Sequence, residues 1–420
     1  MSRPLVELAD IAAPKGIVGG PFGSSLVNKD YAESGVPVIR GANMSLGKFV
    51  SGEFVYVTPE KVESDLSRNQ ARPGDLVFTQ RGTLGQVALV PAVPFERYVV
   101  SQSQMRVTIN PDVADTEYVY YACSSETFLR QISDHAISTG VPHINLGILG
   151  RLRVPLPTLR EQRAIAEVLG ALDDKIAANR RCIQSLNHLA DAEYSRFSME
   201  TTKCESRPDV ITLVELSRMG AIVFGDGYRT KRAELNEDGY RIIRVADIFD
   251  GEIHLNGTDF VSYERRKAIG SKAGQPGDIV LTTKGTVGRL AVFEGAEEPV
   301  VYSPQVCFFR VRNGNGSIER SYLRRWLSSP SFLSQASYRK GNTDMADYLN
   351  LTDIGSMKLD LPPIEDQRVL ANTLEPLEES IASLRREARV LADLRSALLP
   401  RLMSGEFHVR DAERAVSDVV

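Results

Sequence analysis

The sequence has few of the residues that metal, redox or disulfide sites require. Its four cysteines (Cys123, Cys182, Cys204 and Cys307) are scattered with no Cys-x-x-Cys pair, and its five histidines are isolated. These spacings argue against a zinc site and against a disulfide framework. Scattered cysteines are typical of a reducing compartment, so we expect a cytoplasmic protein without a bound metal.

Motifs for nucleotide binding, catalysis and membrane insertion are also missing. There is no Gly-x-x-x-x-Gly-Lys-Ser/Thr loop, and the glycine-rich segment 19–25 lacks the lysine of such a loop. No apolar run approaches the roughly 20 residues of a membrane span, and the first residues lack the apolar core of a signal peptide. No cluster of carboxylates and lysines suggests a nuclease. We therefore expect a protein that is not an enzyme, binds no cofactor directly and contacts no membrane.

The composition is that of an ordinary globular protein. It is 42% hydrophobic and 25% charged, and 420 residues suggest two or three domains. The net charge of −4 does not by itself indicate nucleic-acid binding. It excludes such binding only weakly, because local patches set the field that a phosphate backbone meets.

The chain repeats itself once. The two copies are separated by roughly 200 to 210 residues, whereas solenoid repeats have periods of about 20 to 50. We therefore infer duplication of a whole domain together with a following helix. The matched segments are 5–8 with 213–216, 17–20 with 222–225, 35–43 with 239–247, 73–77 with 276–280, 81–85 with 284–288, 103–104 with 304–305, and 143–146 with 348–351.

Each copy is predicted to be an α+β domain, rich in short strands. Pro-Gly-Asp at 73–75 and at 276–278 reads as a turn that enters a β-branched strand. Segments 116–132 and 319–336 are predicted to be helical. Their expected core residues are Tyr118, Tyr121, Phe128, Leu323, Trp326, Leu327 and Phe332.

The end of each copy carries a heptad pattern, in which spacings of four and three alternate. A pattern sustained over more than three heptads predicts a coiled coil, with Asn179 as a polar seam position that fixes register. Each helix would be about 40 residues, or roughly 60 Å long. The alternative is two amphipathic helices, each packed on its own domain. The seam residues are Ile165, Leu169, Leu172, Ile176, Asn179, Ile183, Leu186 and Ala190, and then Leu370, Leu374, Leu377, Ile381, Leu384, Ala388, Leu391 and Arg395.

These patterns divide the chain into four parts. We predict a first domain at 1–157, a central helix at 158–204, a second domain at 205–362, and a distal helix with a tail at 363–420. Pro157 and Pro362 are expected to stop the last strand of each domain. The Gln-Arg pairs at 162–163 and 367–368 then fall in the first helical turns, where they are placed to lock domain to helix or to face a partner.

Several segments resemble the DNA-specificity subunit of type I restriction–modification enzymes. They are Pro-Leu-Pro-Thr-Leu-Arg-Glu-Gln-Arg at 155–163 and Leu-Pro-Pro-Ile-Glu-Asp-Gln-Arg at 361–368, each opening a long helix. Arg-Gly-Thr-Leu-Gly at 81–85, Lys-Gly-Thr-Val-Gly at 284–288 and the closing Pro-Arg-Leu-Met-Ser-Gly-Glu-Phe at 400–407 are also similar to that family. The resemblance covers essentially the whole chain.

The resemblance implies a fold and a function. Two tandem target-recognition domains, joined by a pair of long antiparallel coiled-coil helices, would each read one half of an asymmetric bipartite sequence in double-stranded DNA. The helices would set the gap between the halves. The subunit would bind two methyltransferase (M) subunits, which use S-adenosylmethionine to methylate adenine at N6, and restriction (R) subunits in the full complex. It would itself be non-catalytic.

Candidate DNA contacts follow from what such reading requires. Cations bind phosphates, while amides, hydroxyls and guanidinium groups reach base edges. Arg81 and Lys284 are the foremost candidates, because each precedes a Gly-Thr where glycine lets the backbone approach closely. Arg40 and Arg244 could equally be structural ion-pair partners. The candidates at predicted turns and strand ends are Lys15, Arg40, Asn43, Gln80, Arg81, Thr83, Gln102, Ser103 and Gln104, and then Tyr228, Arg229, Lys231, Arg244, Thr283, Lys284, Thr286, Gln305, Arg339 and Lys340.

Other interpretations of the same pattern remain open. A coiled-coil scaffold would assemble partners without reading DNA. A specificity module of another DNA-modification defence system would share the plan but serve different subunits. An enzyme with a diverged site is disfavoured by the missing carboxylate cluster.

Overall fold

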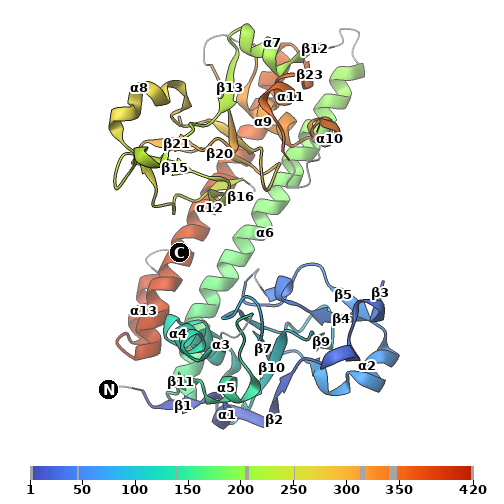
Figure 1. Ribbon diagram of the computed structural model, residues 1–420, viewed down its shortest axis with the longest axis vertical. Coiled ribbons are helices and arrows are strands. Elements are labelled where there is room, and N and C mark those ends of the chain that lie inside the picture. The colour runs from blue at the N-terminus through green and yellow to red at the C-terminus, as the bar shows by residue number, and fades with distance from the viewer. Residues whose placement is uncertain are drawn as a thin grey trace. The chain divides into compact units, whose positions relative to one another are not determined.

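The computed structural model describes residues 3–44, 47–137, 141–203, 208–249, 251–312, 317–339 and 348–417. The chain forms two compact units. Unit 1 comprises Met1–Arg181 and Leu384–Val420, and unit 2 comprises Cys182–Ser383. Each unit combines one β-rich domain with a part of each of two long helices (Figure 1).

The first domain contains two sheets. One has the order β2-β10-β7-β8 and is antiparallel throughout. The other has the order β3-β5-β4-β9-β6, with β4 and β9 parallel. The strands are β2 (Ala12–Gly19), β3 (Tyr31–Ala32), β4 (Val36–Ile39), β5 (Val55–Val57), β6 (Gln70–Ala71), β7 (Leu76–Thr79), β8 (Val87–Leu89), β9 (Tyr98–Val100) and β10 (Gln104–Ile109).

Short helices and one strand pair complete the first domain. Strand β1 (Leu5–Glu7) pairs antiparallel with β11 (Arg153–Pro155), and this brings the start of the chain to the end of the domain. Strand β11 ends before Pro157, as predicted. The helices are α1 (Leu8–Ile11), α2 (Pro59–Asp65), α3 (Thr116–Ser124), α4 (Glu126–His135) and α5 (Leu146–Arg151).

The second domain repeats this plan. Its sheet β13-β22-β19-β20 has the same antiparallel order as β2-β10-β7-β8, and a second sheet has the order β14-β18-β15-β21. Strand β12 (Asp209–Thr212) pairs with β23 (Lys358–Leu361), which ends before Pro362. The other strands are β13 (Ile222–Asp226), β14 (Leu235–Asn236), β15 (Tyr240–Ile243), β16 (Ile248–Phe249), β17 (Glu252–Ile253), β18 (Phe260–Val261), β19 (Ile279–Thr282), β20 (Leu290–Val292), β21 (Val300–Tyr302) and β22 (Val306–Val311).

The helices of the second domain correspond to those of the first. They are α7 (Leu213–Arg218), α8 (Arg266–Ile269), α9 (Arg320–Ser328), α10 (Pro330–Arg339) and α11 (Leu351–Gly355). The seven core residues predicted for the helical segments are all buried, with Trp326 packed edge-on against Phe332. The α+β prediction is confirmed for both copies.

One helical prediction needs correction, because each long segment is two helices and not one. Segment 116–132 breaks between α3 and α4 at Ser125, and segment 319–336 breaks between α9 and α10 at Ser329. Each serine accepts a hydrogen bond from an N–H in the next helix and donates one to a carbonyl of the previous helix. Serine at an N-cap starts a new helix by satisfying an otherwise unpaired N–H. The apolar periodicity ran across this cap and concealed it.

A buried glutamine joins each domain to its long helix. In unit 1 Gln162 accepts from the Asp115 N–H at 2.8 Å and donates to the Pro157 carbonyl at 2.8 Å. In unit 2 Gln367 accepts from the Glu319 N–H at 3.0 Å and donates to the Pro362 carbonyl at 2.8 Å. The contacts are the same in both copies. They therefore support the expectation that this helix start fixes the domain to the helix.

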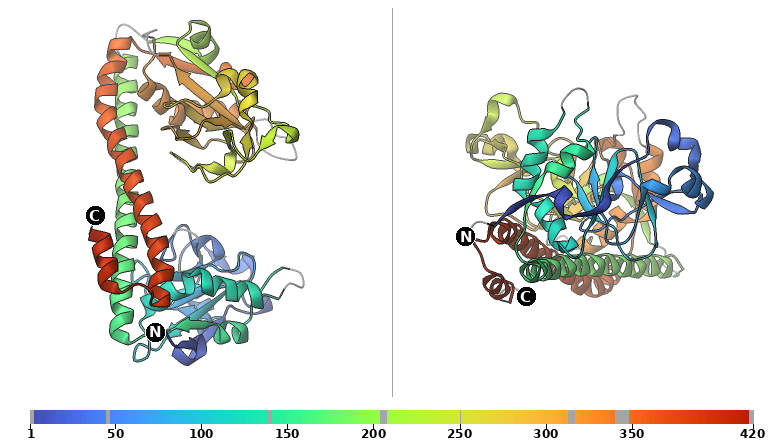
Figure 2. Two further views of the ribbon diagram at one scale, coloured as in Figure 1. Left: turned by 90° about the vertical axis from the view of Figure 1, so that its left-hand side faces the viewer. Right: turned by 90° about the horizontal axis from the view of Figure 1, so that it is seen from below.

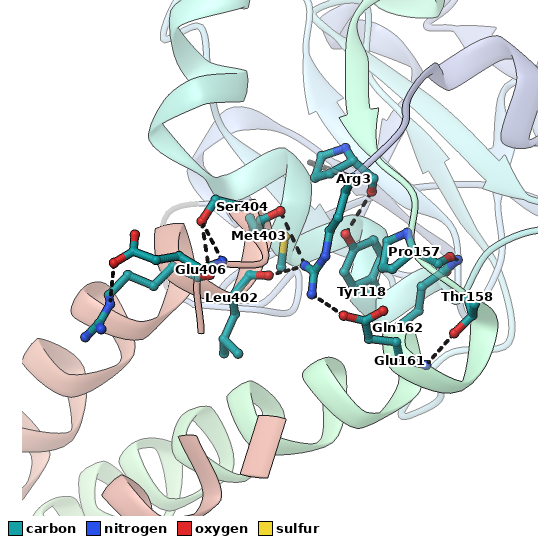
Figure 3. Close-up of polar contacts among 12 residues, drawn as sticks. Arg3, Tyr118, Pro157, Thr158, Glu161, Gln162, Leu402, Met403, Ser404 and Glu406 are labelled. Atoms are coloured by element: carbon teal, nitrogen blue, oxygen red, sulfur yellow. Dashed lines mark hydrogen bonds and ion pairs between the residues drawn. The ribbon is translucent and has the colours of Figure 1, made fainter. Parts of the chain in front are cut away.

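The chain's first described residue strengthens this junction in unit 1 (Figure 3). The Arg3 guanidinium donates to the Leu402 and Met403 carbonyls and forms an ion pair with Glu161. Arg3 therefore ties the end of one long helix to the first turn of the other.

The two long helices are α6 (Leu159–Lys203) and α12 (Ile364–Ser404). Within unit 1, Asp173 pairs with Arg395 and Lys175 with Glu387, so higher numbers on α6 meet lower numbers on α12 and the helices run antiparallel. Figure 2 shows the two helices side by side in each unit. Helix α13 (Val409–Ser417) packs on the hydrophobic core of unit 1 that also contains residues of α6 and α12.

The heptad stripe is shared between helix–helix and helix–domain packing. In unit 1 Ile165, Leu169 and Leu391 belong to one core with Tyr118 and Phe128 of the domain. In unit 2 Leu370 and Leu374 share a core with the domain in the same way. The two interpretations of the stripe are therefore both correct, because each helix packs on its partner and on its domain. The remaining seam residues are buried or half-buried: Leu172, Ile176, Ile183, Leu186, Ala190, Leu377, Ile381, Leu384, Ala388 and Arg395.

Asn179 lies on the seam and is only 4% exposed. Its side-chain Nδ2 has no hydrogen-bond partner among the described residues. A lone polar seam residue of this kind favours one register at a cost in stability.

The structure also corrects the repeat alignment. Leu8 and Leu213 are the equivalent residues, because each is buried and opens a short helix directly after the strand that pairs with β11 or β23. The match of 5–8 with 213–216 is therefore shifted by three positions. Gly20 likewise corresponds to Gly227 and not to Gly225, since their N–H groups donate to the carbonyls of Gln104 and Val306 at equivalent places in the sheet.

The described residues provide neither a membrane span nor a metal site. No helix among them is both long and apolar enough to cross a membrane. No group of three or more His, Cys, Asp or Glu side chains among them could hold a metal ion.

Candidate nucleic-acid interface

The same end of the four-stranded sheet gathers polar residues in both domains. In the first domain β2 and β7 end where β10 begins, and in the second domain β13 and β19 end where β22 begins. We call these ends the polar edges of the two domains. Antiparallel pairing alone brings these three strand ends together.

The polar edge of the first domain presents Gln80, Arg81 and Ser103. The N–H groups of Gln80 and Arg81 donate to the Ser103 carbonyl, at 2.7 and 3.4 Å. Arg81 also forms a β-bridge with His143 and is exposed, and Thr83 follows in the exposed turn between β7 and β8. Gly82 has a φ of 98°, a left-handed conformation that glycine adopts without strain.

A polar hollow of about 760 Å³ adjoins this edge. Arg40, Gln102, Ser103 and Gln104 all contribute to its lining, so it brings together four of the sequence candidates. Arg40 is half-buried, and its Nε has no hydrogen-bond partner among the described residues. Lys29 and Tyr31 also line the hollow.

The polar edge of the second domain is equivalent but differs in chemistry. Thr283 donates its N–H to the Gln305 carbonyl at 2.8 Å, as Gln80 does to Ser103. Gln305 is therefore equivalent to Ser103, and the sequence match of 103–104 with 304–305 is shifted by one position. Lys284 bridges to Tyr348, as Arg81 does to His143. Lys284, Thr286 and Gln305 are exposed.

Three cations surround one carboxylate at this second edge. Burial raises the pKa of Asp226 above its usual value, and the nearby charges of Lys284, Lys272 and Arg229 oppose that rise. Lys272 is held in place by donating to the Gly227 carbonyl at 3.0 Å. Cations grouped in this way attract anions, a phosphate backbone among them.

Three sequence candidates are corrected because their side chains are buried. Asn43, Gln104 and Thr283 are each 1% exposed. Asn43 donates to the Ser51 and Glu53 carbonyls and accepts from the Arg40 N–H, so it closes a turn. Thr283 donates its hydroxyl to Gln305, and Gln104 accepts from Ser101. These polar groups are used by the fold, so they are not available to DNA in this conformation.

Other candidates reach the surface but already have partners. Arg244 forms an ion pair with Asp259, the structural role considered for it above. Tyr228 donates to Glu234 at 3.1 Å. Gln102 donates to two carbonyls of the loop at 23–26, and Arg339 donates to the Gln335 carbonyl at the end of α10.

Three candidates do not join the polar edges. Lys15 lies in the bulged middle of β2, where its φ is 58°, and not at the end of that strand. Lys231 is exposed in the loop that leads away from β13. Lys340 lies outside the described residues.

The sequence reading left out three residues of the polar edges. Phe22 is 84% exposed beside Gly20, and the corrected alignment places Arg229 at its position in the second domain. Asp226 and Lys272 were missed because neither belongs to a matched segment. The signal for Asp226 was its place just after the apolar segment 222–224 and directly before a glycine.

Gly20 and Gly227 allow the chain to pass close to the sheet at these edges. A Cβ on Gly227 would lie 2.0 Å from the Tyr302 carbonyl oxygen, and one on Gly20 would lie 2.0 Å from the Ser101 carbonyl oxygen. Backbone atoms cannot rotate away as side chains can. We therefore expect Gly227→Ala to destabilise unit 2 by about 1 to 3 kcal/mol.

Gly225→Ala is the matched control for this substitution. A Cβ there would meet only the Phe308 ring, at 3.7 Å, which is an ordinary contact. Urea unfolding followed by the fluorescence of Trp326, the single tryptophan of the chain, reports on unit 2. We expect a change within about 0.5 kcal/mol for the control. Equal effects of the two substitutions would contradict the corrected alignment.

Comparison with known proteins gives a consistent result. The family described as Type I restriction modification DNA specificity domain matches residues 23–188 and again 212–391. The specificity subunit of the type I restriction enzyme MjaIX from Methanocaldococcus jannaschii is 22% identical over 418 residues, covering 94% of this chain and 92% of that protein. The EcoBI specificity subunit from Escherichia coli is 25% identical over 340 residues, covering 74% and 70%.

A solved structure shares the fold. The S subunit of a type I restriction–modification system from M. genitalium is 17% identical to this chain, with 96% of each chain covered and a TM-score of 0.56. The fold prediction, with two tandem domains and two long helices, is therefore confirmed. The doubled family match, the shared fold and the paired polar edges lead to one conclusion. This chain belongs to the type I restriction–modification DNA specificity family, and it supplies DNA specificity to a complex of other subunits without being the catalyst.

Proposed function

We propose that the two domains read the two halves of an asymmetric bipartite sequence in double-stranded DNA. The observation that carries this proposal is the pair of equivalent polar edges with different side chains. Arg81 and Ser103 in the first domain correspond to Lys284 and Gln305 in the second. Direct readout depends on the donor and acceptor pattern of each side chain, so different edges would select different bases.

The partners follow from the same proposal. Two methyltransferase subunits would bind this chain and methylate adenine at N6. They, and not this chain, would bind and use S-adenosylmethionine. Restriction subunits would join in the full complex. The free cysteines Cys123, Cys182 and Cys307 are consistent with a cytoplasmic location, where thiols stay reduced. Arg163 and Arg368 are exposed in the first turns of the long helices. We propose that a methyltransferase subunit docks on the surface around each of them.

The test is a map of N6-methyladenine in cells that contain this chain and its methyltransferase. We expect methylation at one bipartite motif that disappears when the chain is absent. Replacing Arg81 by alanine should relax or abolish only one half of the motif, by a factor of about 5 to 100 in preference. Methylation that is independent of this chain would contradict the proposal. If this chain were a scaffold that does not contact DNA, the Arg81 variant would methylate the same motif as wild type.

A further inference from the structure

The polar edge of the second domain contains a carboxylate, a group that a surface binding only phosphates would not need. Asp226 is half-buried at the end of β13, opposite Cys307 of β22. Its carboxylate has neither a hydrogen bond nor an ion pair within 4.0 Å among the described residues. Lys284, Lys272 and Arg229 are close enough to oppose the rise that burial causes in the pKa of Asp226, but they form no ion pair with it within 4.0 Å.

This arrangement is costly for the free protein. Half-burial penalises the ionised carboxylate, as the raised pKa of Asp226 reflects, and no donor from the described residues compensates this penalty. A negative charge also weakens the attraction of the three cations for phosphate. A carboxylate here is therefore useful only to a ligand that brings a hydrogen-bond donor of its own.

The first domain has no counterpart to this group. The sheet register places Gly19 opposite Met105 and Asp226 opposite Cys307, and these are equivalent positions. Gly19 offers no side chain, and its carbonyl accepts from Asn69 at 2.8 Å. The carboxylate thus distinguishes one domain from the other, as a specificity group should, and is not part of the shared framework.

We propose that Asp226 determines specificity by accepting a hydrogen bond from the exocyclic amino group of a cytosine or an adenine in the half-site of the second domain. This inference rests on the proposed function. In the major groove only cytosine N4 and adenine N6 present donors, while guanine and thymine present acceptors that a carboxylate repels. The cations hold the phosphates, and Asp226 then accepts or rejects the base.

The experiment uses the purified complex of this chain with its methyltransferase subunits. Its preferred sequence is first selected from a pool of random duplexes with wild-type protein, Asp226→Asn and Asp226→Ala. Asp209→Asn is the charge-matched control, since Asp209 is exposed on β12 in the same unit. We expect both Asp226 variants to lose a preference of about 5- to 100-fold at one base pair of one half-site, with the other half-site unchanged.

A second measurement removes the amino group instead of the carboxylate. Duplexes carry purine in place of adenine, or pyrimidin-2-one in place of cytosine, at each position of the half-site. One such replacement should weaken wild-type binding but have no further effect in Asp226→Ala, because the two changes remove the same contact. This arm tests wild-type protein even if a variant fails to fold.

The outcomes separate this inference from the proposed function. Wild-type protein with no sequence preference would overturn the proposed function. A selective wild type whose Asp226 variants keep every preference and bind all duplexes more tightly would overturn this inference alone, since Asp226 would then be only a repelling charge. A half-site in which no amino group matters to wild-type binding would also overturn it.

Discussion

Replacing Arg229, Lys272 and Lys284 together by alanine should weaken DNA binding by about a hundredfold or more at physiological salt, with similar losses for specific and non-specific duplexes. All three surround Asp226 at the polar edge of the second domain. Each phosphate contact that is lost should also lower the salt dependence, measured as the slope of log K against log salt, by about 0.9. Fluorescence anisotropy with labelled duplexes at several salt concentrations measures both quantities.

A matched control removes three cations from elsewhere in the same unit. Arg218 on α7, Arg320 on α9 and Lys358 on β23 are exposed and lie away from the polar edge. Their triple alanine variant has the same net charge as the test variant. We expect it to bind nearly as tightly as wild type. Equal losses in the two variants would show that net charge matters and that the polar edge does not.

Replacing Gln367 by leucine should destabilise unit 2 by about 2 to 5 kcal/mol. The substitution leaves the Glu319 N–H and the Pro362 carbonyl buried without partners, and each unsatisfied group costs about 1 to 3 kcal/mol. Gln367→Glu keeps the acceptor but buries a carboxylate against the Pro362 carbonyl, so at neutral pH it should also be strongly destabilising. Urea unfolding followed by Trp326 fluorescence measures the change, because Trp326 is buried in the core that includes Leu370.

Arg368→Ala is the control for this prediction. Arg368 is the next residue, and its exposed side chain pairs with Glu319 and Glu365. Exposed ion pairs contribute about 0 to 1 kcal/mol, so the unfolding midpoint should hardly move. If Gln367→Leu were as mild as Arg368→Ala, the glutamine would not be the lock between domain and helix.

The sequence predicted the architecture because the architecture depends on periodic patterns. Heptads gave the long helices, and prolines at 157 and 362 marked the ends of the last strands. Because the chain is duplicated, each of these patterns occurs twice and the two copies support each other. The Gln-Arg pairs were placed in the first helical turns, but their different roles were not predicted. Gln162 is buried between backbone groups, whereas Arg163 is exposed, and only three-dimensional contacts distinguish the two.

The predictions that were wrong depend on single residues and not on the periodicity of apolar residues. Ser125 and Ser329 divide predicted helices because of one capping hydrogen bond each, which an apolar pattern cannot reveal. The repeat alignment shifted by three residues at Leu8 because the sequence Leu-Val-Glu-Leu happens to occur in both copies at different structural positions.

The candidate site was predicted in outline only. Arg81 and Lys284 do occupy equivalent exposed positions, whereas Asn43 and Thr283 are used internally. Polarity in a sequence does not say whether a group faces solvent or a backbone carbonyl. Asp226 was missed for a related reason, because two of the cations near it, Lys272 and Lys284, are distant in sequence. Which of the exposed candidates touch bases stays a prediction.

The most direct test of the central claim is a selection of random duplexes by the purified complex, repeated with one altered domain at a time. Wild-type protein should enrich a bipartite motif with an unspecified gap. Arg81→Ala should change only one half of the motif, and Gln305→Ala, at the exposed edge of the second domain, should change only the other. A single undivided motif, or a change in both halves from either substitution, would contradict the claim that each domain reads its own half-site.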